Sequence, residues 1–528
     1  MICLPLAVFI LLGLFLQIHA AFSHSSFILD DVEVISEEEW NEIVGSKTYV
    51  DLDFSTLSYN GGSPAYVEEE RIVYLPQQLD SSSWEGVLTC LNDAELMVLN
   101  HSTLYDRETA LQEGTSFSCL AVTKDTYSEF FIVFTGVSTV QISYNDEEDL
   151  TDKTVNHDGV ITIQGTDGSC TISDCVFHVK GDWTLNYYKK NYKIELKTKE
   201  GENNHLSLLG MRSDDDWMLN AMYSDGSRVR EPLAYALWEE MQILSGQSDA
   251  ATSHMVFVEV FLNDVYRGLY VLQEPVDAKS FNLEEGDFLY KTTDREVDSW
   301  AEGITQYNGQ EEIEGADIKW PKDSSLMDWS ILESLYDFDE RSITLDELEE
   351  QGIELDTTNL ALFNLFVFLT RAEDTTWKNI FFVCTNEGDG TYLIQQYPWD
   401  LNASFGDNFG GDYTEDSAEE IINKYGEEAN QSKLWLAYRD SCPEEANELI
   451  CSMWSELRDA GLSSELVCSM LTDLWSDVLS SGAVFRDADR WPDTVDGNDY
   501  TNMLSWIERR FATMDSYFGY TAQEEQNR

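Results

Sequence analysis

Three oxygen-bearing side chains in the second half of the chain have the types and spacing that phosphoryl transfer requires. Asp374 and Asn379 enclose four residues, Thr-Thr-Trp-Lys, and Asp400 follows in the triplet Trp-Asp-Leu. The same Asp-x4-Asn spacing occurs in phosphotransferase catalytic loops, which are followed by an Asp that holds metal. Asp374 is therefore the candidate group that orients or deprotonates an acceptor hydroxyl. Asn379 and Asp400 are candidate ligands of Mg²⁺ or Mn²⁺, which prefer hard oxygen donors.

The elements expected around these residues bring them together. The apolar periodicity of residues 358–371 predicts a helix that ends just before Asp374, capped near Asp356 or Thr357. A hairpin predicted over residues 380–397, with its turn in the Gly-rich stretch 386–390, returns the chain to Asp400. Each acid also has a structural explanation, Asp374 as an ordinary loop residue and Asp400 as an acceptor of backbone hydrogen bonds. The helix–loop–hairpin context favours the chemical explanation.

The order of elements along the whole chain predicts an α+β protein with a two-lobed, protein-kinase-like fold. Short alternating apolar runs indicate a β-rich N-lobe with one main helix at residues 228–244, followed by a hairpin and a helical C-lobe. An N-terminal β-rich extension precedes the N-lobe. The expected boundaries are a signal peptide at 1–20, a β-rich region at 21–165, the N-lobe at 166–277, the C-lobe at 278–520 and a polar tail at 521–528.

The predicted N-lobe contains the candidate groups for ATP. Lys193 is the first candidate for a lysine that contacts phosphate, because it lies on a predicted strand, and Lys190 is the second. Arg230, on the lone helix, is a further phosphate or carboxylate partner, and Glu274 lies where a hinge would present backbone groups to adenine. Lys193 could equally lie on a solvated strand face without contacting ATP. Arg230 could equally be a surface arginine near the start of its helix. No Gly-x-Gly-x-x-Gly loop precedes the lysines.

Composition restricts the partners. The chain has 99 acidic and 32 basic residues, a formal net charge of −67. Such a surface repels phosphate backbones and anionic lipid, so binding to nucleic acid is excluded and a basic protein partner is favoured. The 15 tryptophans also raise the alternative of a carbohydrate-active protein with paired carboxylates, although most of them lie in predicted helices or strands and are expected in the core.

The N-terminus and the cysteines predict export. Residues 2–18 are almost all apolar and precede Ala20 and Ala21, as in a cleaved signal peptide, with an uncleaved anchor as the alternative. No membrane span is expected after cleavage, and a secreted or cell-surface location follows. Eight cysteines remain, enough for four disulfides, with Cys90–Cys119 and Cys170–Cys175 as local pairings. Sequons predict a glycoprotein. They begin at Asn100, Asn402 and Asn430.

Several segments together resemble the CotH kinase family, which comprises spore-coat-protein-H-like atypical kinases and cell-surface relatives. The resemblance covers roughly residues 175–520, in order, and its first quoted segment is Gly181–Leu196, which contains Lys189-Lys-Asn-Tyr-Lys-Ile194. Other matching segments are Leu208-Leu-Gly-Met211, Asp216-Trp-Met-Leu-Asn-Ala221, Arg230-Glu-Pro-Leu-Ala-Tyr235, Gly268-Leu-Tyr-Val-Leu-Gln-Glu274, Tyr397-Pro-Trp-Asp-Leu-Asn402 and Trp506-Ile-Glu-Arg-Arg510. The resemblance implies a secretory-pathway kinase that uses ATP and Mg²⁺ or Mn²⁺ to phosphorylate Ser or Thr of exported proteins, including cell-surface or coat partners.

By position, the resemblance makes Asp374 the loop aspartate and Asp400 the Trp-Asp metal ligand. The family often has a second acid where this chain has Asn402, which still offers a carbonyl oxygen to the metal but carries no charge. A glycan on Asn402 would block the site, so we expect that sequon to be unmodified. The changed acid and the missing Gly-rich loop favour the alternative, a catalytically inactive CotH-like adhesin, binding protein or structural protein.

Overall fold

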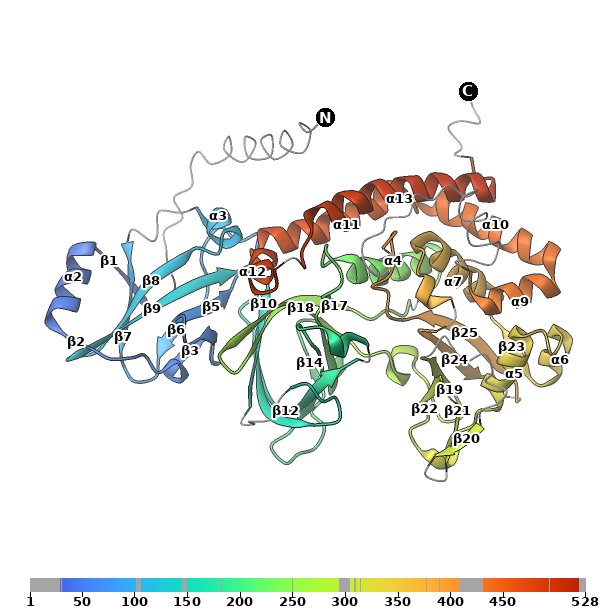
Figure 1. The fold of residues 1–528 in the computed structure, drawn as a ribbon, viewed down its shortest axis with the longest axis horizontal. Helices are drawn as coiled ribbons and strands as arrows, with labels where there is room; N and C mark the ends of the chain where they lie inside the picture. Colours follow the sequence, from blue (N-terminus) through green and yellow to red (C-terminus); the bar gives the residue numbers. More distant parts are fainter. Residues whose placement is uncertain are drawn as a thin grey trace. The chain divides into compact units, whose positions relative to one another are not determined.

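A computed structural model describes residues 29–521 apart from residues 30, 101–105, 145–149, 182, 249, 294–303, 308–309, 314, 377, 389, 408–430 and 493. The chain forms two compact units (Figure 1). Unit 1 comprises Met1–Ala221, Val256–Gln273 and Ser476–Asp493, and unit 2 comprises Met222–Met255, Glu274–Trp475 and Thr494–Arg528. The elements are a mixture of helices and sheets, which confirms the α+β class.

The first part of unit 1 is a seven-stranded sheet with the strand order β1-β7-β8-β9-β5-β4, in which β2 also pairs with β9. Its core is apolar, with Val73, Phe117, Ile132 and Phe134 all buried. The short helices α2 (Glu37–Ser46) and α3 (Arg107–Gln112) and the ribbon β3–β6 (Leu57–Tyr59, Leu88–Cys90) accompany it. The strands are β1 (Val32–Ile35), β2 (Thr48–Tyr49), β4 (Ala65–Val67), β5 (Ile72–Pro76), β7 (Glu95–Leu99), β8 (Ser116–Val122) and β9 (Thr126–Thr135).

The second part of unit 1 is a closed barrel with the strand order β10-β11-β12-β13-β16-β18-β17. On β13, Tyr192, Ile194 and Leu196 are buried and alternate with more exposed residues, as expected for strand periodicity. β10 and β11 precede residue 166 and nevertheless belong to the barrel. The barrel strands are β10 (Ser138–Tyr144), β11 (His157–Gln164), β12 (Cys170–Lys180), β13 (Asn191–Lys197), β16 (Asp216–Asn220), β17 (Met255–Leu262) and β18 (Val265–Gln273).

The helix α12 (Ala483–Arg490), from the distant C-terminal part of the chain, packs against the barrel strand β18. Asp487 Oδ1 accepts a hydrogen bond from the backbone N–H of Leu269 at 2.9 Å, and Arg486 forms an ion pair of 2.7 Å with the buried Glu259. Unit 1 therefore includes residues from both halves of the sequence.

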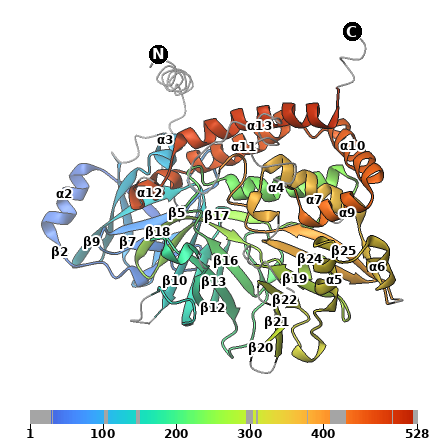
Figure 2. The ribbon, with the colours of Figure 1, turned by 45° about the vertical axis from the view of Figure 1, so that its right-hand side comes forward.

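Unit 2 contains a five-stranded sheet with the order β22-β19-β24-β25-β23, and helices pack against it. Helix α7 contacts β25, and α4, α10 and α13 contact α7 (Figure 2). Twelve of the 14 residues of α7 are buried, as expected for a helix that is apolar on all sides. The helices are α4 (Arg230–Leu244), α5 (Ser330–Asp339), α6 (Leu345–Glu350), α7 (Thr357–Thr370), α9 (Lys433–Ser441), α10 (Pro443–Ala460), α11 (Ser464–Ser480) and α13 (Gly497–Phe518).

The strands of this sheet are β19 (Phe288–Thr292), β22 (Ala316–Trp320), β23 (Ile353–Leu355), β24 (Ile380–Asn386) and β25 (Tyr392–Pro398). β24 and β25 form the predicted hairpin, in the register that pairs Ile380 with Pro398 and Asn386 with Tyr392. The two-stranded ribbons are β14–β15 (Leu206–Ser207, Ser213–Asp214) and β20–β21 (Ile304–Tyr307, Gln310–Ile313). The hairpin and the helix before it confirm the local elements on which the candidate site depends.

The expected disulfides are not found. All eight cysteines after the predicted signal are free thiols in the structure. Cys170 and Cys175 lie five residues apart on one strand, β12, which separates their Cα atoms by about 16 Å, whereas a disulfide requires less than about 7 Å. Among the described residues, no helix has the length and apolar character needed to span a bilayer. The predicted signal peptide lies outside the described residues.

Candidate active site at the end of α7

Helix α7 ends in a backbone turn that starts the candidate catalytic loop. Arg371 adopts a left-handed conformation with φ +55° and closes the helix through its backbone N–H and the carbonyl of Val367. A short 3₁₀ turn, Glu373–Thr375, follows, and the Thr375 hydroxyl donates to the Trp399 carbonyl at 3.3 Å. The loop is thus attached at one end to a buried helix and at the other to the residue before Asp400.

Asp374 has two cationic or amide partners inside the loop. Its Oδ2 accepts from Asn379 Nδ2 at 3.2 Å and lies 2.9 Å from Lys378 Nζ. The Asp374 side chain is 11% exposed, so both contacts are partly screened from water. The Asp374–Asn379 hydrogen bond brings together the two ends of the Asp-x4-Asn motif.

Asn379 is buried and linked to two strands through its backbone. Its N–H donates to the Thr292 carbonyl at 2.9 Å, and its carbonyl accepts from the Trp399 N–H at 2.9 Å. Because the side-chain nitrogen donates to Asp374, the amide oxygen is the remaining side-chain atom that can ligate a cation. The contact with Trp399 places Asn379 next to the residue that precedes Asp400.

Asp400 follows strand β25 and is exposed. The Trp399 ring packs edge-to-face against Phe381, with 5.7 Å between the ring centroids. It also contacts Lys291, whose Nζ lies 5.0 Å from the indole ring centroid. Asn402 is half-buried in the turn that follows. The exposed Asp400 therefore follows directly after a tryptophan that is packed against the end of the hairpin.

Arg230, expected at the phosphates, is buried inside the protein instead. Its side chain is 0% exposed, and Nη1 donates to the carbonyls of Ser404 at 2.6 Å and Phe405 at 3.2 Å. Its Nη2 donates to Asp499 Oδ1 at 2.7 Å. These contacts attach α4 to the segment after Asp400 and to α13. The geometry favours a positioning role for Arg230, and its contact with the ATP phosphates stays a prediction.

Three carboxylates surround this guanidinium. Arg230 Nε lies 3.7 Å from Asp225 Oδ1 and 3.9 Å from Asp407 Oδ2, in addition to the bond with Asp499. Burial raises the pKa of Asp499 to about 6, and Arg230 opposes that rise. Asp499 was missed in the sequence analysis because 269 positions separate it from Arg230 and no local pattern connects the two, whereas Asp225 lies five residues before Arg230 and was not selected.

A small cavity of about 20 Å³ borders the candidate loop at Thr376 and Ile380. Asp339, at the end of α5, also lines it and is 6% exposed. Within the described part of the chain neither carboxylate oxygen of Asp339 has a hydrogen-bond partner, and Arg341 Nη1 is 3.8 Å from Oδ1. Burial raises the pKa of Asp339 to about 7.

The candidate lysines lie in unit 1. Lys193 is 40% exposed and pairs with Asp216 at 3.2 Å, while Lys190 Nζ donates to the Leu185 carbonyl at 2.6 Å. The buried lysine of this segment is Lys189, which sequence analysis did not select. Its side chain is 0% exposed, and its Nζ lies 2.8 Å from Asp487 Oδ1 on α12. Only the distant Asp487 distinguishes Lys189 from its neighbours.

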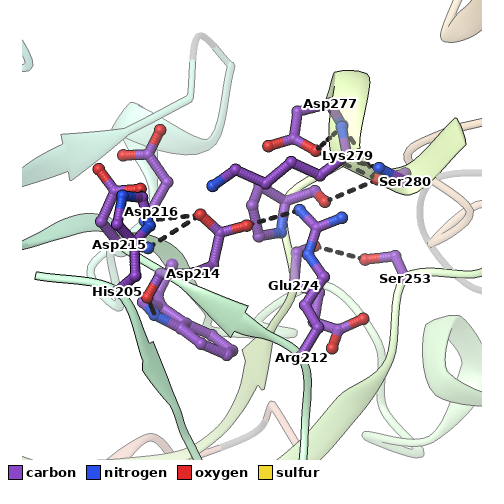
Figure 3. Close-up of polar contacts among 12 residues, drawn as sticks. His205, Arg212, Asp214, Asp215, Asp216, Ser253, Glu274, Asp277, Lys279 and Ser280 are labelled. Atoms are coloured by element: carbon purple, nitrogen blue, oxygen red, sulfur yellow. Dashed lines mark hydrogen bonds and ion pairs between the residues drawn. The ribbon is translucent and has the colours of Figure 1, made fainter. Parts of the chain in front are cut away.

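Glu274, expected at a hinge in contact with adenine, has its backbone groups bonded within unit 2. Its N–H donates to the His254 carbonyl at 3.0 Å, and its carbonyl accepts from the Ser253 hydroxyl at 2.6 Å (Figure 3). The carboxylate accepts from His254 Nδ1 at 2.9 Å, a bond that raises the pKa of His254. A nucleotide would have to replace these backbone bonds or use other groups of the segment.

The geometry thus defines an α+β protein with an Asp–Asn loop and a Trp-Asp turn at the base of one hairpin. A family model described as CotH kinase protein matches residues 177–514, more than half of the chain. The chain belongs to the CotH kinase family, which confirms the resemblance. Comparison with curated proteins gives no match.

Proposed function

We propose that the chain is a CotH-type protein kinase that transfers the γ-phosphate of ATP to Ser or Thr hydroxyls of exported proteins. Family membership supports the reaction class. The observation that carries the proposal is the pair of contacts at Asn379, whose side chain binds Asp374 while its carbonyl binds the residue before Asp400. These contacts link the Asp-x4-Asn loop to the Trp-Asp turn within unit 2, which supports the proposal.

The oxygen donors at this location fit Mg²⁺ or Mn²⁺. Asp400 offers an exposed carboxylate, and Asn379 and Asn402 offer amide oxygens, a donor set that suits hard divalent ions. When bound, such an ion would neutralise the charge of the ATP phosphates. Asp374 orients the acceptor hydroxyl and takes its proton, since Lys378 and Asn379 hold its carboxylate in place. Lys193 and Lys190 are proposed to contact the ATP phosphates, and residues near Glu274 the adenine.

The proposed location is the secretory pathway or cell surface, supported by the apolar N-terminal run. The charge of −67 favours a basic acceptor protein. The test is transfer of labelled phosphate from ATP to protamine, or to the chain itself, with Mn²⁺ or Mg²⁺. Asp400→Asn and Asp374→Asn should each lower the rate by at least about 100-fold, the scale of a lost acid–base or metal contact.

The matched control is Glu387→Gln, which removes an exposed carboxylate from the far end of the same hairpin. We expect this variant to retain the full rate. Equal rates for Asp400→Asn and the parent protein would contradict the proposal, because the phosphate would then be transferred at another site.

One contact favours the second candidate, a CotH-like binding protein without catalysis. The ion pair of Lys378 with Asp374, at 2.9 Å, occupies the carboxylate oxygen that a base would offer to the acceptor hydroxyl. If this pair disables the loop, Lys378→Met should produce or increase phosphate transfer. A folded parent protein with no transfer and no nucleotide-dependent thermal shift would favour the binding protein.

A further inference from the structure

We propose that His205, Asp214 and Asp215 form a second divalent-cation site, located in unit 1, that takes Zn²⁺ or Mn²⁺. The site shares no residue with the Asp374–Asp400 region, and its existence does not depend on kinase activity. One ligand atom from each of the three side chains lies within 4.8 Å of the other two. The cluster combines an imidazole nitrogen with two carboxylates, and Zn²⁺ binds both types of donor.

The spacing suits a single ion. His205 Nδ1 lies 3.0 Å from Asp215 Oδ1. Two ligands at about 2.1 Å from one ion are about 3 Å apart when adjacent and about 4.2 Å apart when opposite. The distance between His205 Nδ1 and Asp215 Oδ1 matches that of two adjacent ligands. The ligand atom of Asp214 lies within 4.8 Å of both, so only a small inward movement would bring it to the ion.

The backbone around the ligands is fixed by strand pairing. His205 directly precedes β14, and Asp214 ends β15, which pairs with β14 in the register Leu206 with Asp214. The carbonyl of Asp215 accepts from the Leu196 N–H on the barrel strand β13 at 2.7 Å. Ligands held on paired strands are better preorganised than ligands on a free loop, and binding orders fewer side chains.

Asp214 has the outer contacts that orient a metal-binding carboxylate. Its Oδ1 accepts from the backbone N–H groups of Asp215 at 2.8 Å and Asp216 at 3.4 Å (Figure 3). Its Oδ2 lies 2.8 Å from Arg212 Nη2. Carboxylate ligands are typically held by such hydrogen bonds, so Arg212 is expected to remain bound when the ion is present.

Burial and donor type together favour a transition ion. Asp214 is 0% and Asp215 6% exposed, whereas the His205 side chain is 52% exposed. The carboxylates thus lie at the closed side of the site, and the imidazole lies at the side where the ion and its waters enter. A neutral imidazole is a good ligand for Zn²⁺ and a poor one for Mg²⁺ and Ca²⁺, which prefer oxygen, and the two carboxylates also suit Mn²⁺.

The test is a calorimetric titration of the full chain with Zn²⁺ at neutral pH, without nucleotide, together with electron spin echo spectroscopy of bound Mn²⁺. The spectrum of the parent protein should contain the nitrogen modulation of a coordinated imidazole. His205→Gln should remove this modulation and weaken Zn²⁺ at this site by about 100-fold or more. Asp215→Asn should weaken Zn²⁺ binding by a similar factor and should reduce the nitrogen modulation in the Mn²⁺ spectrum.

Asp158→Asn is the matched control, because it removes an exposed carboxylate from strand β11 of the same unit. This variant and Asp400→Asn should both retain the nitrogen signal. Loss of the signal in Asp400→Asn, or unchanged Zn²⁺ affinity in His205→Gln, would overturn the proposal. The cluster would then be only a hydrogen-bonded His–Asp pair. A thermal melt without metal checks that His205→Gln is folded.

Discussion

Replacement of Arg230 by Met tests whether this arginine holds unit 2 together. The substitution keeps an unbranched side chain but leaves the carbonyls of Ser404 and Phe405 without their buried donor and Asp499 without its cation. Breaking a buried ion pair costs about 3–5 kcal/mol, and a buried orphan acceptor costs about 1–3 kcal/mol. Because the carbonyls are released together and can relax, we expect a total loss of about 4 kcal/mol from the free energy of unfolding.

The loss should depend on pH, since Asp499 can take up a proton. Its pKa is about 6 in the parent protein and is held down by Arg230, so it should rise in Arg230→Met. The variant therefore loses less stability at pH 5, where Asp499 is protonated, than at pH 8. The difference is about 1.4 kcal/mol for each unit by which the pKa rises.

Differential scanning calorimetry measures both effects and can resolve transitions of separate units. Arg439→Met is the matched control, because Arg439 is 30% exposed and pairs with the exposed Asp440 at 3.2 Å. Exposed pairs contribute at most about 1 kcal/mol. If Arg230→Met cost no more than Arg439→Met, or if its cost were the same at pH 5 and pH 8, the positioning role of Arg230 would be refuted.

Two further predictions concern buried charges. Asp339 has a pKa raised to about 7 by burial, so its contribution to stability is present below about pH 4 and is lost as the pH rises through 7. Asp339→Asn should remove this pH dependence from the urea midpoint, and an unchanged profile would show that Asp339 does not titrate there. Lys189→Met, which leaves Asp487 buried without its cation, should cost about 3–5 kcal/mol. Lys193→Met should cost less than about 1 kcal/mol, and equal costs would contradict the burial difference.

Local sequence signals predicted the elements that carry the candidate loop. The apolar run of α7 begins at the Asp356 cap, and the alternation of β24 and β25 around a Gly-rich turn gives the hairpin. Each pattern involves only residues that are close together in the sequence, in one helix or in two strands joined by one turn. Such short-range regularities are what sequence periodicity records.

The ion pairs that fix the positions of these elements were not predictable in the same way. Lys189, Lys190 and Lys193 are equivalent by residue type, and only the distant Asp487 makes Lys189 the buried one. Arg230 is at the start of an amphipathic helix, where surface arginines are common, and its carboxylate partners come from three separate segments. Tertiary contacts of this kind leave no periodic pattern in a single sequence.

The backbone at the base of the β24–β25 hairpin gives an independent argument for the candidate site. Asn379, before the hairpin, has φ +58°, and Asp400, after it, has φ +59°. Glycine adopts this left-handed conformation without strain, whereas Asn and Asp tolerate it at some cost because of their short polar side chains. Both positions have an oxygen-bearing side chain where the backbone alone would favour glycine. Strained residues of this kind cluster at functional sites. The left-handed backbone of the two residues proposed as metal ligands therefore agrees with a functional position for them.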